Sequence, residues 1–319
     1  MPQPTKSKAQ ARRSQSSKAQ ARKSKSSSAT RSDPVSIGII GGSGLYTMDG
    51  LTGAREVRVK TPFGDPSDAF VVGTLEGRRV AFLSRHGRGH VYSPSEINYR
   101  ANICGFKMLG ATRLIAVSAV GSLREDLPPL DFLIPNQYFD RTRSRVSTFF
   151  SGGIVAHVGF DKPTCPRLSE HLAAACRRAE VPVHDTGTYV CIEGPQFSTI
   201  AESHTYRQLR FDVIGMTSLT EAKLAREAEL CYATFALITD YDCWHPQHDS
   251  VTVNEIIANL NKNAENVQRA IREALRAIGD ERTCKCGSAL AHAIITDRSK
   301  IPAATNKRLA PIIGKYFPS

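Results

Sequence analysis

The sequence lacks the features that mark several large classes of protein. None of its apolar runs approaches the roughly 20 residues of a transmembrane helix, and no signal-peptide core follows the N-terminus. Its eight cysteines have no framework spacing, which argues against a disulfide-stapled secreted domain and favours a reducing cytoplasm. With 319 residues, 41% hydrophobic and 23% charged, the chain is typical of a globular protein with one large domain or two small ones.

Motifs for nucleotide cofactors and metals are also missing. There is no Gly-x4-Gly-Lys-Ser/Thr loop, and Gly42-x-Gly44 is followed by Thr47 where a dinucleotide fold needs glycine, which argues against a dinucleotide-dependent oxidoreductase. No two histidines have metal-binding spacing, and Cys284-x-Cys286 is too tight and too solitary for zinc. We therefore expect a metal-free site without a cofactor. The cysteine pair has two interpretations, unlinked thiols or a redox-labile local disulfide.

The net charge of +12 is concentrated at the N-terminus. Residues 1–33 carry nine Lys and Arg against one acid, a net +8, which leaves +4 on the other 286 residues. This segment has no Leu, Ile, Val, Phe or Tyr and contains a tandem repeat, so we predict a disordered basic tail followed by a folded domain over 34–319. Three roles stay open for the tail: a dispensable solvated extension, weak contact with nucleic acid or an anionic surface, and an organelle-targeting peptide. A nucleic-acid-binding function would rest wholly on this segment.

From residue 36 onward, apolar and β-branched runs alternate with helical patterns. The predicted strands are residues 36–40, 69–74, 79–84, 112–118, 188–192, 212–215 and 231–239. Capping-box sequences predict helices that open at Ser93, Ser218 and Thr252, and another helix is expected over 166–180. This alternation predicts an α/β fold: a single domain with a mostly parallel or mixed, twisted central sheet flanked by helices.

Polar or glycine-rich breaks follow six of these strands. The breaks are residues 41–44, 85–88, 118–122, 193–198, 216–217 and 240–242. Because open α/β sheets bind their ligands at the carboxyl ends of the strands, we expect one site assembled from several loops. A glycine-rich turn, the Arg85-His86 pair and the hydroxyls of Ser43, Ser118 and Thr217 suit a tetrahedral oxyanion such as phosphate.

Asp240 and Asp242 follow the last of the predicted strands. In an extended chain, residues i and i+2 share a face, so both carboxylates are expected at one point of the site. Two acids held together resist joint ionisation, so one keeps a proton near neutral pH. The protonated acid can donate to a ring nitrogen and the ionised one can accept from an exocyclic amine, which suits a purine leaving group. An ordinary acidic cap at a strand end is the alternative. Apolar candidates to face the ring or a thioether are Phe197, Met216, Val253, Ile256 and Ile257.

A series of segments between residues 36 and 278 is similar to one known family. The segments read IGIIGGSGL at 37–45, TPFG at 61–64, RHG at 85–87, GSLR at 121–124, IEGP at 192–195 and TDYDCW at 239–244. They resemble the S-methyl-5′-thioadenosine phosphorylase branch of the trimeric purine nucleoside phosphorylases. The resemblance implies a purine-nucleoside-phosphorylase-like fold, conversion of methylthioadenosine and phosphate to adenine and 5-methylthioribose 1-phosphate in purine and methionine salvage, and a homotrimer or a hexamer built from trimers. A phosphorylase for 6-oxopurine nucleosides such as inosine, guanosine or methylthioinosine is the alternative.

The same resemblance implies roles for the residues that match the family's motifs. Asp240 would protonate or hydrogen-bond the base at N7, and Asp242 would contact the exocyclic amine or orient its partner. Met216 would lie against the ribose and the base. Phosphate, the co-substrate, would be held by Ser43, Arg85, His86, Ser118, Ala119 and Thr217.

The resemblance also implies which residues set specificity. Ser198 stands where 6-oxopurine-specific relatives have Glu. Val253, Ile256 and Ile257 would line the methylthio pocket. His90 would approach the site, and His157 would reach it from a neighbouring subunit.

Overall fold

The predicted α/β architecture is confirmed: the residues that the structure describes form one mixed sheet of 11 strands with helices on both faces. The computed structural model describes residues 34–42, 48–245 and 253–317. All seven predicted strands are present: β1 (Ile37–Gly41), β3 (Phe70–Leu75), β4 (Arg78–Ser84), β5 (Arg113–Ser122), β9 (Thr188–Ile192), β10 (Val213–Gly215) and β11 (Cys231–Asp240). Four further strands were not predicted, because they are either exposed or two residues long: β2 (Thr52–Val57), β6 (Phe132–Leu133), β7 (Gln137–Arg141) and β8 (Val183–His184).

Strand β5 lies at the centre of the sheet, and its pairing leaves a gap. β11 runs parallel to one edge of β5 from Arg113 to Gly121. On the other edge, β1 pairs parallel with residues 113–116, and β10 pairs antiparallel with Gly121 and Ser122. Between these two pairings, residues 117–120 face no strand of the described chain on that edge. The sheet is therefore open at the point where it changes from parallel to antiparallel.

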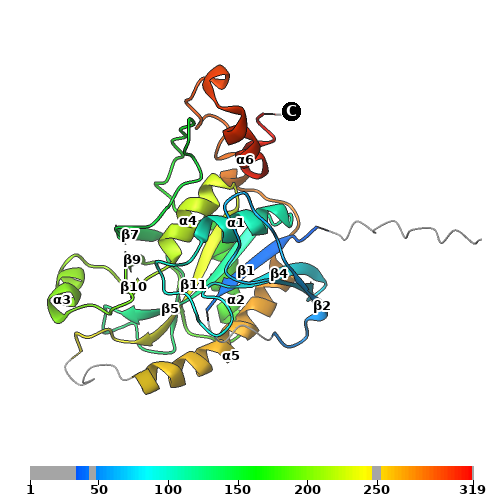
Figure 1. Cartoon of the computed structure of the whole chain (residues 1–319). Coiled ribbons are helices and arrows are strands. Elements are labelled where there is room, and N and C mark those ends of the chain that lie inside the picture. Colours follow the sequence, from blue (N-terminus) through cyan, green and yellow to red (C-terminus); the bar gives the residue numbers. More distant parts are fainter. Residues whose placement is uncertain (1–33, 43–47, 246–252, 318–319) are drawn as a thin grey trace, which may run out of the picture. The chain divides into compact units, whose positions relative to one another are not determined.

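The described residues form six α-helices around this sheet (Figure 1). They are α1 (Tyr99–Met108), α2 (Pro166–Arg178), α3 (Ile200–Gln208), α4 (Ser218–Glu227), α5 (Val253–Ala277) and α6 (Ala303–Ile313). Helices α2 and α5 pack against each other and against β11, whereas α1 packs against α4. Along β4, Ala81 and Leu83 join the core beneath α1 and α4, and Val80 and Phe82 join the core beneath α2 and α5. Because successive side chains of a strand point to opposite faces of the sheet, β4 contributes to two cores, one on each face.

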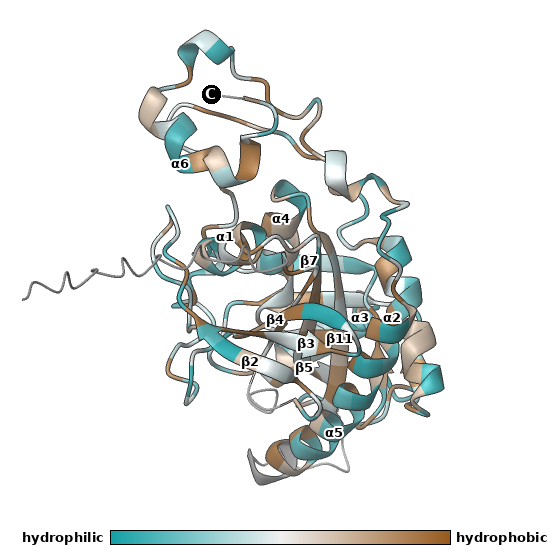
Figure 2. Cartoon of the chain, turned by 90° about the vertical axis from the view of Figure 1, so that its right-hand side faces the viewer, coloured by the Kyte–Doolittle hydropathy of each residue, from teal (hydrophilic) through white to brown (hydrophobic). Residues whose placement is uncertain are grey.

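The hydropathy of the elements follows this layering. Figure 2 shows apolar strands at the centre, while α2 and α5 carry both hydrophilic and hydrophobic stretches. No helix in the described part of the chain combines the length and the apolar character that a membrane span requires.

The capping box at Ser93 does not open a helix. Glu96 Oε2 accepts a hydrogen bond from the Ser93 amide at 2.9 Å, but α1 begins only at Tyr99, with Asn98 as its N-cap. The carbonyl of Pro94 accepts the Tyr99 hydroxyl at 2.8 Å instead of a helical amide. The motif therefore closes a turn, and the predicted N-cap, Ser93, was wrong by five residues, because the N-cap is Asn98. The predicted helices over 166–180 and from residue 252 onward are confirmed as α2 and α5.

The expectation that Cys284 and Cys286 form a solitary pair was wrong, because two further cysteines lie beside them. Cys165 is the N-cap of α2, and Cys231 is the first residue of β11. The four Sγ atoms all lie within 4.8 Å of one another. Spacing along the chain concealed this cluster, because its members come from three segments that only the fold brings together.

Candidate active site

A cavity of about 650 Å³ opens at the gap in β5. This volume is within the range of about 300–1,000 Å³ that small-molecule sites occupy. The four residues of the gap, Val117 to Val120, all line it. Of the predicted site residues, the wall contains Arg85, His86, His90, Ser118, Ala119, Phe197, Ser198, Met216, Thr217, Asp240 and Asp242. The loops after β4, β9, β10 and β11 therefore converge on one site.

The remaining predicted residues are not found in this wall. Ser43 lies outside the described residues, as do the side chains of Val253 and Ile256. Ile257 is 48% exposed and does not line the cavity, and His157 is on the surface of the chain.

Helix α5 contributes three wall residues that the sequence analysis missed, namely Leu260, Ala264 and Val267. Counted from Ile256, they follow at intervals of four, four and three residues, which places them on one face of a helix. Extending that helical pattern would have found them.

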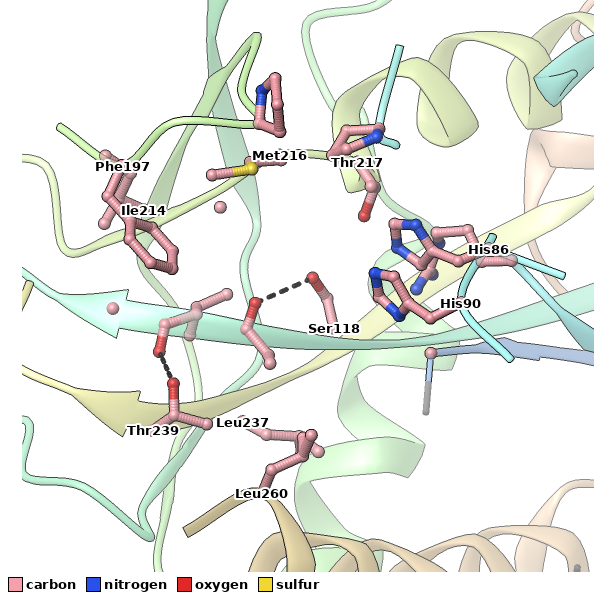
Figure 3. Close-up of a pocket in the computed structure, with 18 of the residues that line it drawn as sticks. His86, His90, Ser118, Phe197, Ile214, Met216, Thr217, Leu237, Thr239 and Leu260 are labelled. Carbon is pink, nitrogen blue, oxygen red and sulfur yellow. Dashed lines mark hydrogen bonds between the residues drawn. The ribbon is translucent and has the colours of Figure 1, made fainter. Parts of the chain in front are cut away.

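One end of the cavity gathers hydrogen-bonding groups that suit an anion. Thr217 is the N-cap of α4, yet its hydroxyl makes no capping bond. Figure 3 shows this hydroxyl, the Ser118 hydroxyl and the His86 ring directed toward the same region. The N-terminus of α4 adds the positive end of a helix dipole, which favours a bound anion. Neutral hydroxyls and a helix N-terminus thus lie together at this end, and such groups suit an oxyanion.

Arg85 lines this end, but its guanidinium fork faces Glu221. Nε lies 2.5 Å from Glu221 Oε1 and Nη2 lies 3.0 Å from Oε2, with both side chains buried. Nη1 donates to the carbonyl of Val117 at 2.9 Å. The helix predicted to open at Ser218 is confirmed, since Ser218 is the first residue of α4, but its capping box is wrong: Glu221 pairs with Arg85 instead of capping the helix. The expected cationic fork for phosphate is largely occupied within the protein.

His86 is neutral in the free site. Burial, with a smaller contribution from the adjacent Arg85, lowers the pKa of His86 to about 4. Its Nδ1 lies 2.8 Å from the carbonyl of Tyr92, and since a carbonyl only accepts, Nδ1 carries the hydrogen. The ring stacks on His90 with centroids 4.1 Å apart. Nε2 is then a hydrogen-bond acceptor that can pair with a hydroxyl of a bound phosphate.

The two acids lie at the other end of the cavity. A register irregularity between Ile238 and Asp240 ends β11, and Asp242 has a φ of +53°, so the chain is not extended through this pair as expected. Asp240 accepts the Thr239 hydroxyl at 2.6 Å and the Asp242 amide at 2.8 Å. Burial raises the pKa of Asp240, and burial with the charge of Asp240 raises the pKa of Asp242 to about 6. A side chain at Gly121 would place its Cβ 3.0 Å from Asp240 Oδ1, so glycine makes room for the pair.

Apolar side chains connect the two ends. Leu237 and Leu260 lie across the cavity from Met216 (Figure 3). Phe197 borders the cavity and is 65% exposed. The Ser198 hydroxyl is buried and has no hydrogen-bond partner among the described residues, so a ligand group in the cavity can satisfy it. Within the described chain, the side chains with metal-ligand geometry are the four clustered cysteines, at the far end of β11.

Comparison with known proteins agrees with this geometry. Residues 36–276 match the model of the phosphorylase superfamily. An S-methyl-5′-thioadenosine phosphorylase of Koribacter versatilis is 63% identical over 281 residues, which cover 88% of this chain and 96% of the relative. A crystal structure of a methylthioadenosine phosphorylase from an antarctic soil metagenomic library has a TM-score of 0.84 at 51% identity, covering 88% of this chain and 99% of that one. The Schistosoma mansoni methylthioadenosine phosphorylase in complex with adenine has a TM-score of 0.77 at 36% identity, covering 82% and 99%. The chain therefore belongs to the phosphorylase superfamily and, within it, to the family of the S-methyl-5′-thioadenosine phosphorylases.

Proposed function

We propose that the protein cleaves S-methyl-5′-thioadenosine with inorganic phosphate, giving adenine and 5-methylthioribose 1-phosphate. The observation that carries the proposal is a two-ended cavity, with oxyanion donors at one end, the half-buried Asp240 and the buried Asp242 at the other, and apolar walls between them. The names of the relatives support the same reaction. The bond from C1′ to N9 breaks, a bond from C1′ to a phosphate oxygen forms, and adenine leaves with a proton.

At the purine end, we assign Asp240 as the general acid. Burial raises the pKa of both acids, which favours a neutral carboxyl that can donate to N7 as the C1′–N9 bond breaks. The other acid then accepts from the 6-amino group. General acid catalysis of this kind contributes about 10²–10⁴ in rate. At position 6 a 6-oxopurine presents a carbonyl acceptor to the second acid instead of an amino donor, which argues for adenine nucleosides.

At the phosphate end, Ser118, Thr217 and the N-terminus of α4 would hold the co-substrate. His86 Nε2 would accept a hydrogen bond from the phosphate hydroxyl, which leaves an ionised phosphate oxygen to attack C1′. A fixed anion beneath the sugar also stabilises the cationic carbon that develops as the base departs. These residues need no cofactor for this chemistry.

The apolar wall would determine the substituent at C5′. Leu237, Leu260 and Val267 suit a methylthio group, whereas the 5′-hydroxyl of adenosine would be left without a partner there. We therefore expect methylthioadenosine to be preferred over adenosine.

The experiment that tests this function is purine-base release from methylthioadenosine, adenosine, inosine and methylthioinosine, with and without phosphate. Phosphate-dependent release of adenine from methylthioadenosine, well above the 6-oxo substrates, is expected. Preference for inosine or methylthioinosine would contradict the proposed base recognition and leave the phosphorylase reaction intact. Release that needs no phosphate would make the protein a hydrolase.

We also propose a homotrimer, with a hexamer as the larger form, in the cytoplasm. Val155 and Ile295 form an exposed apolar strip: the Ile295 amide donates to the Val155 carbonyl, and their side chains are 46% and 63% exposed. His157 is two residues from Val155, and its amide donates to the carbonyl of Ala293. A neighbouring subunit that covers this strip would bury apolar surface and bring His157 to an active site. Light scattering gives the mass, and His157→Ala is expected to raise KM for the nucleoside. Eight unpaired cysteines suit a reducing compartment.

A further inference from the structure

The four-cysteine cluster lies outside the cavity and has no part in the proposed reaction. Its members are Cys165, Cys231, Cys284 and Cys286, whose Sγ atoms lie within 4.8 Å of one another. The Sγ atoms of Cys231 and Cys284 are 3.3 Å apart. Cys284 is half-buried and the other three are buried. An ion can therefore reach the cluster from solvent at Cys284, while the other three thiols are shielded from water.

The separations fit a common ion at the centre of the four sulfurs. Zinc–sulfur bonds of about 2.3 Å in a tetrahedron place the sulfurs about 3.8 Å apart. The contacts observed here therefore need to change by roughly 1 Å or less to reach that geometry. None of the eight cysteines forms a disulfide, so all four thiols are available as ligands.

The surroundings favour negative charge at the cluster. Cys165 caps the N-terminus of α2, where the helix dipole stabilises a thiolate. Arg113 is buried, is the register partner of Cys231 in β5, and donates to the carbonyls of Asp280 and Glu281 just before Cys284. A cation and a helix end thus lie beside four sulfurs.

We propose that these four cysteines bind one zinc ion in a closed, structural site. The four thiols would lose their protons to the solvent as Zn²⁺ binds, leaving a site with a net charge of −2 that Arg113 and the end of α2 partly balance. The ion would tie the start of α2 and the start of β11 to the 3-10 turn η1 (Lys285–Ser288). Cys231 and Asp240 are the first and last residues of β11, so about 30 Å of strand separates the metal from the general acid. Its role is therefore in stability and not in catalysis.

Metal content of the full, untagged chain tests the proposal. The protein is purified with reductant and without chelator, and zinc is measured by elemental analysis and by native mass spectrometry. About one zinc per chain is expected in the wild type and in Cys104→Ser, a matched control at a buried cysteine of the other core. Cys286→Ser and the half-buried Cys284→Ser are expected to lose it. Replacement by Co²⁺ should give the visible bands of a tetrahedral four-thiolate site in the wild type and in the control only.

Thermal unfolding adds a readout that separates a site from a contaminant. A strong zinc chelator should lower the Tm of the wild type and of Cys104→Ser, and leave Cys284→Ser unchanged. The proposal is overturned if the reduced wild type neither retains nor takes up zinc, or if all the variants hold the same amount. It is also overturned if thiol counting finds the cluster oxidised to disulfides and reduction does not restore zinc binding. Phosphorolysis of methylthioadenosine is expected to be the same in the wild type and in Cys104→Ser whichever result is obtained.

Discussion

At the scale of single residues, the proposed chemistry depends on two carboxyl groups with different surroundings. Asp240 accepts hydrogen bonds from the Thr239 hydroxyl and the Asp242 amide, and burial raises its pKa. Replacing it by Asn keeps the shape and removes the transferable proton. Asp240→Asn is therefore expected to lower kcat for adenine release by about 10²–10⁴ while the Tm is retained. Normal turnover in this variant would remove Asp240 as the general acid.

The raised pKa of Asp242 predicts how the stability of the fold changes with pH. Its pKa is raised from 3.8 to about 6, so the folded protein favours the neutral acid. The stabilisation it contributes is fully present below pH 3.8 and is lost as the pH rises through about 6. At pH 8 the fold holds a buried charge that an amide would lack. Asp242→Asn should therefore be about 1–3 kcal/mol more stable than the wild type at pH 8.

Denaturant unfolding across pH 4–8 measures this difference. The difference in the free energy of unfolding between Asp242→Asn and the wild type should become smaller below about pH 6. The exposed acid Asp65 offers a control, since Asp65→Asn buries no charge. A stability difference between Asp242→Asn and the wild type that is the same at pH 4.5 and pH 8 would contradict a raised pKa at Asp242.

At the scale of elements, helix α4 links the phosphate end to a buried ion pair. Its N-terminus faces the cavity at Thr217, and one turn later Glu221 holds Arg85. Removing one partner of such a pair leaves the other charge uncompensated. Glu221→Gln is therefore expected to destabilise the fold by about 3–5 kcal/mol.

Urea unfolding measures the destabilisation caused by Glu221→Gln, and the same change in an exposed ion pair serves as the comparison. Glu170 bonds Arg167 on the surface, and Glu170→Gln should cost less than about 1 kcal/mol. Combining Glu221→Gln with Arg85→Met removes both charges and should restore part of the lost stability. Equal effects of the two Glu→Gln changes would show that burial does not strengthen the pair.

At the scale of the whole molecule, residues Asp33–Ser319 form a compact unit by themselves. Every residue of the cavity wall belongs to this unit, and the family match begins at residue 36. Deleting residues 1–33 should therefore leave kcat/KM for methylthioadenosine unchanged. Any binding to DNA or RNA should disappear with the net +8 that the segment carries. Loss of phosphorolysis on truncation would assign the tail a role in the enzyme.

Local patterns in the sequence were enough to predict the main strands and the place of the site. Buried strands are continuous apolar runs, and polar breaks at their carboxyl ends meet in an open α/β sheet. For this reason Asp240, Ser118 and Thr217 were predicted to share one site, and all three line the cavity. The fold class was also predicted as observed. The family resemblance supplied the reaction and the roles of individual residues.

The features that the sequence did not reveal are contacts between distant segments. Glu221 fits the spacing of a capping box, and only the fold shows that it lies against Arg85. Exposed strands such as β2 and β7 have no apolar alternation to identify them. Cys165 and Cys231 join Cys284 and Cys286 only because the start of α2, the start of β11 and the turn after α5 lie at one place. Periodicity reports what a segment buries, whereas the partner that each side chain meets is decided by tertiary packing.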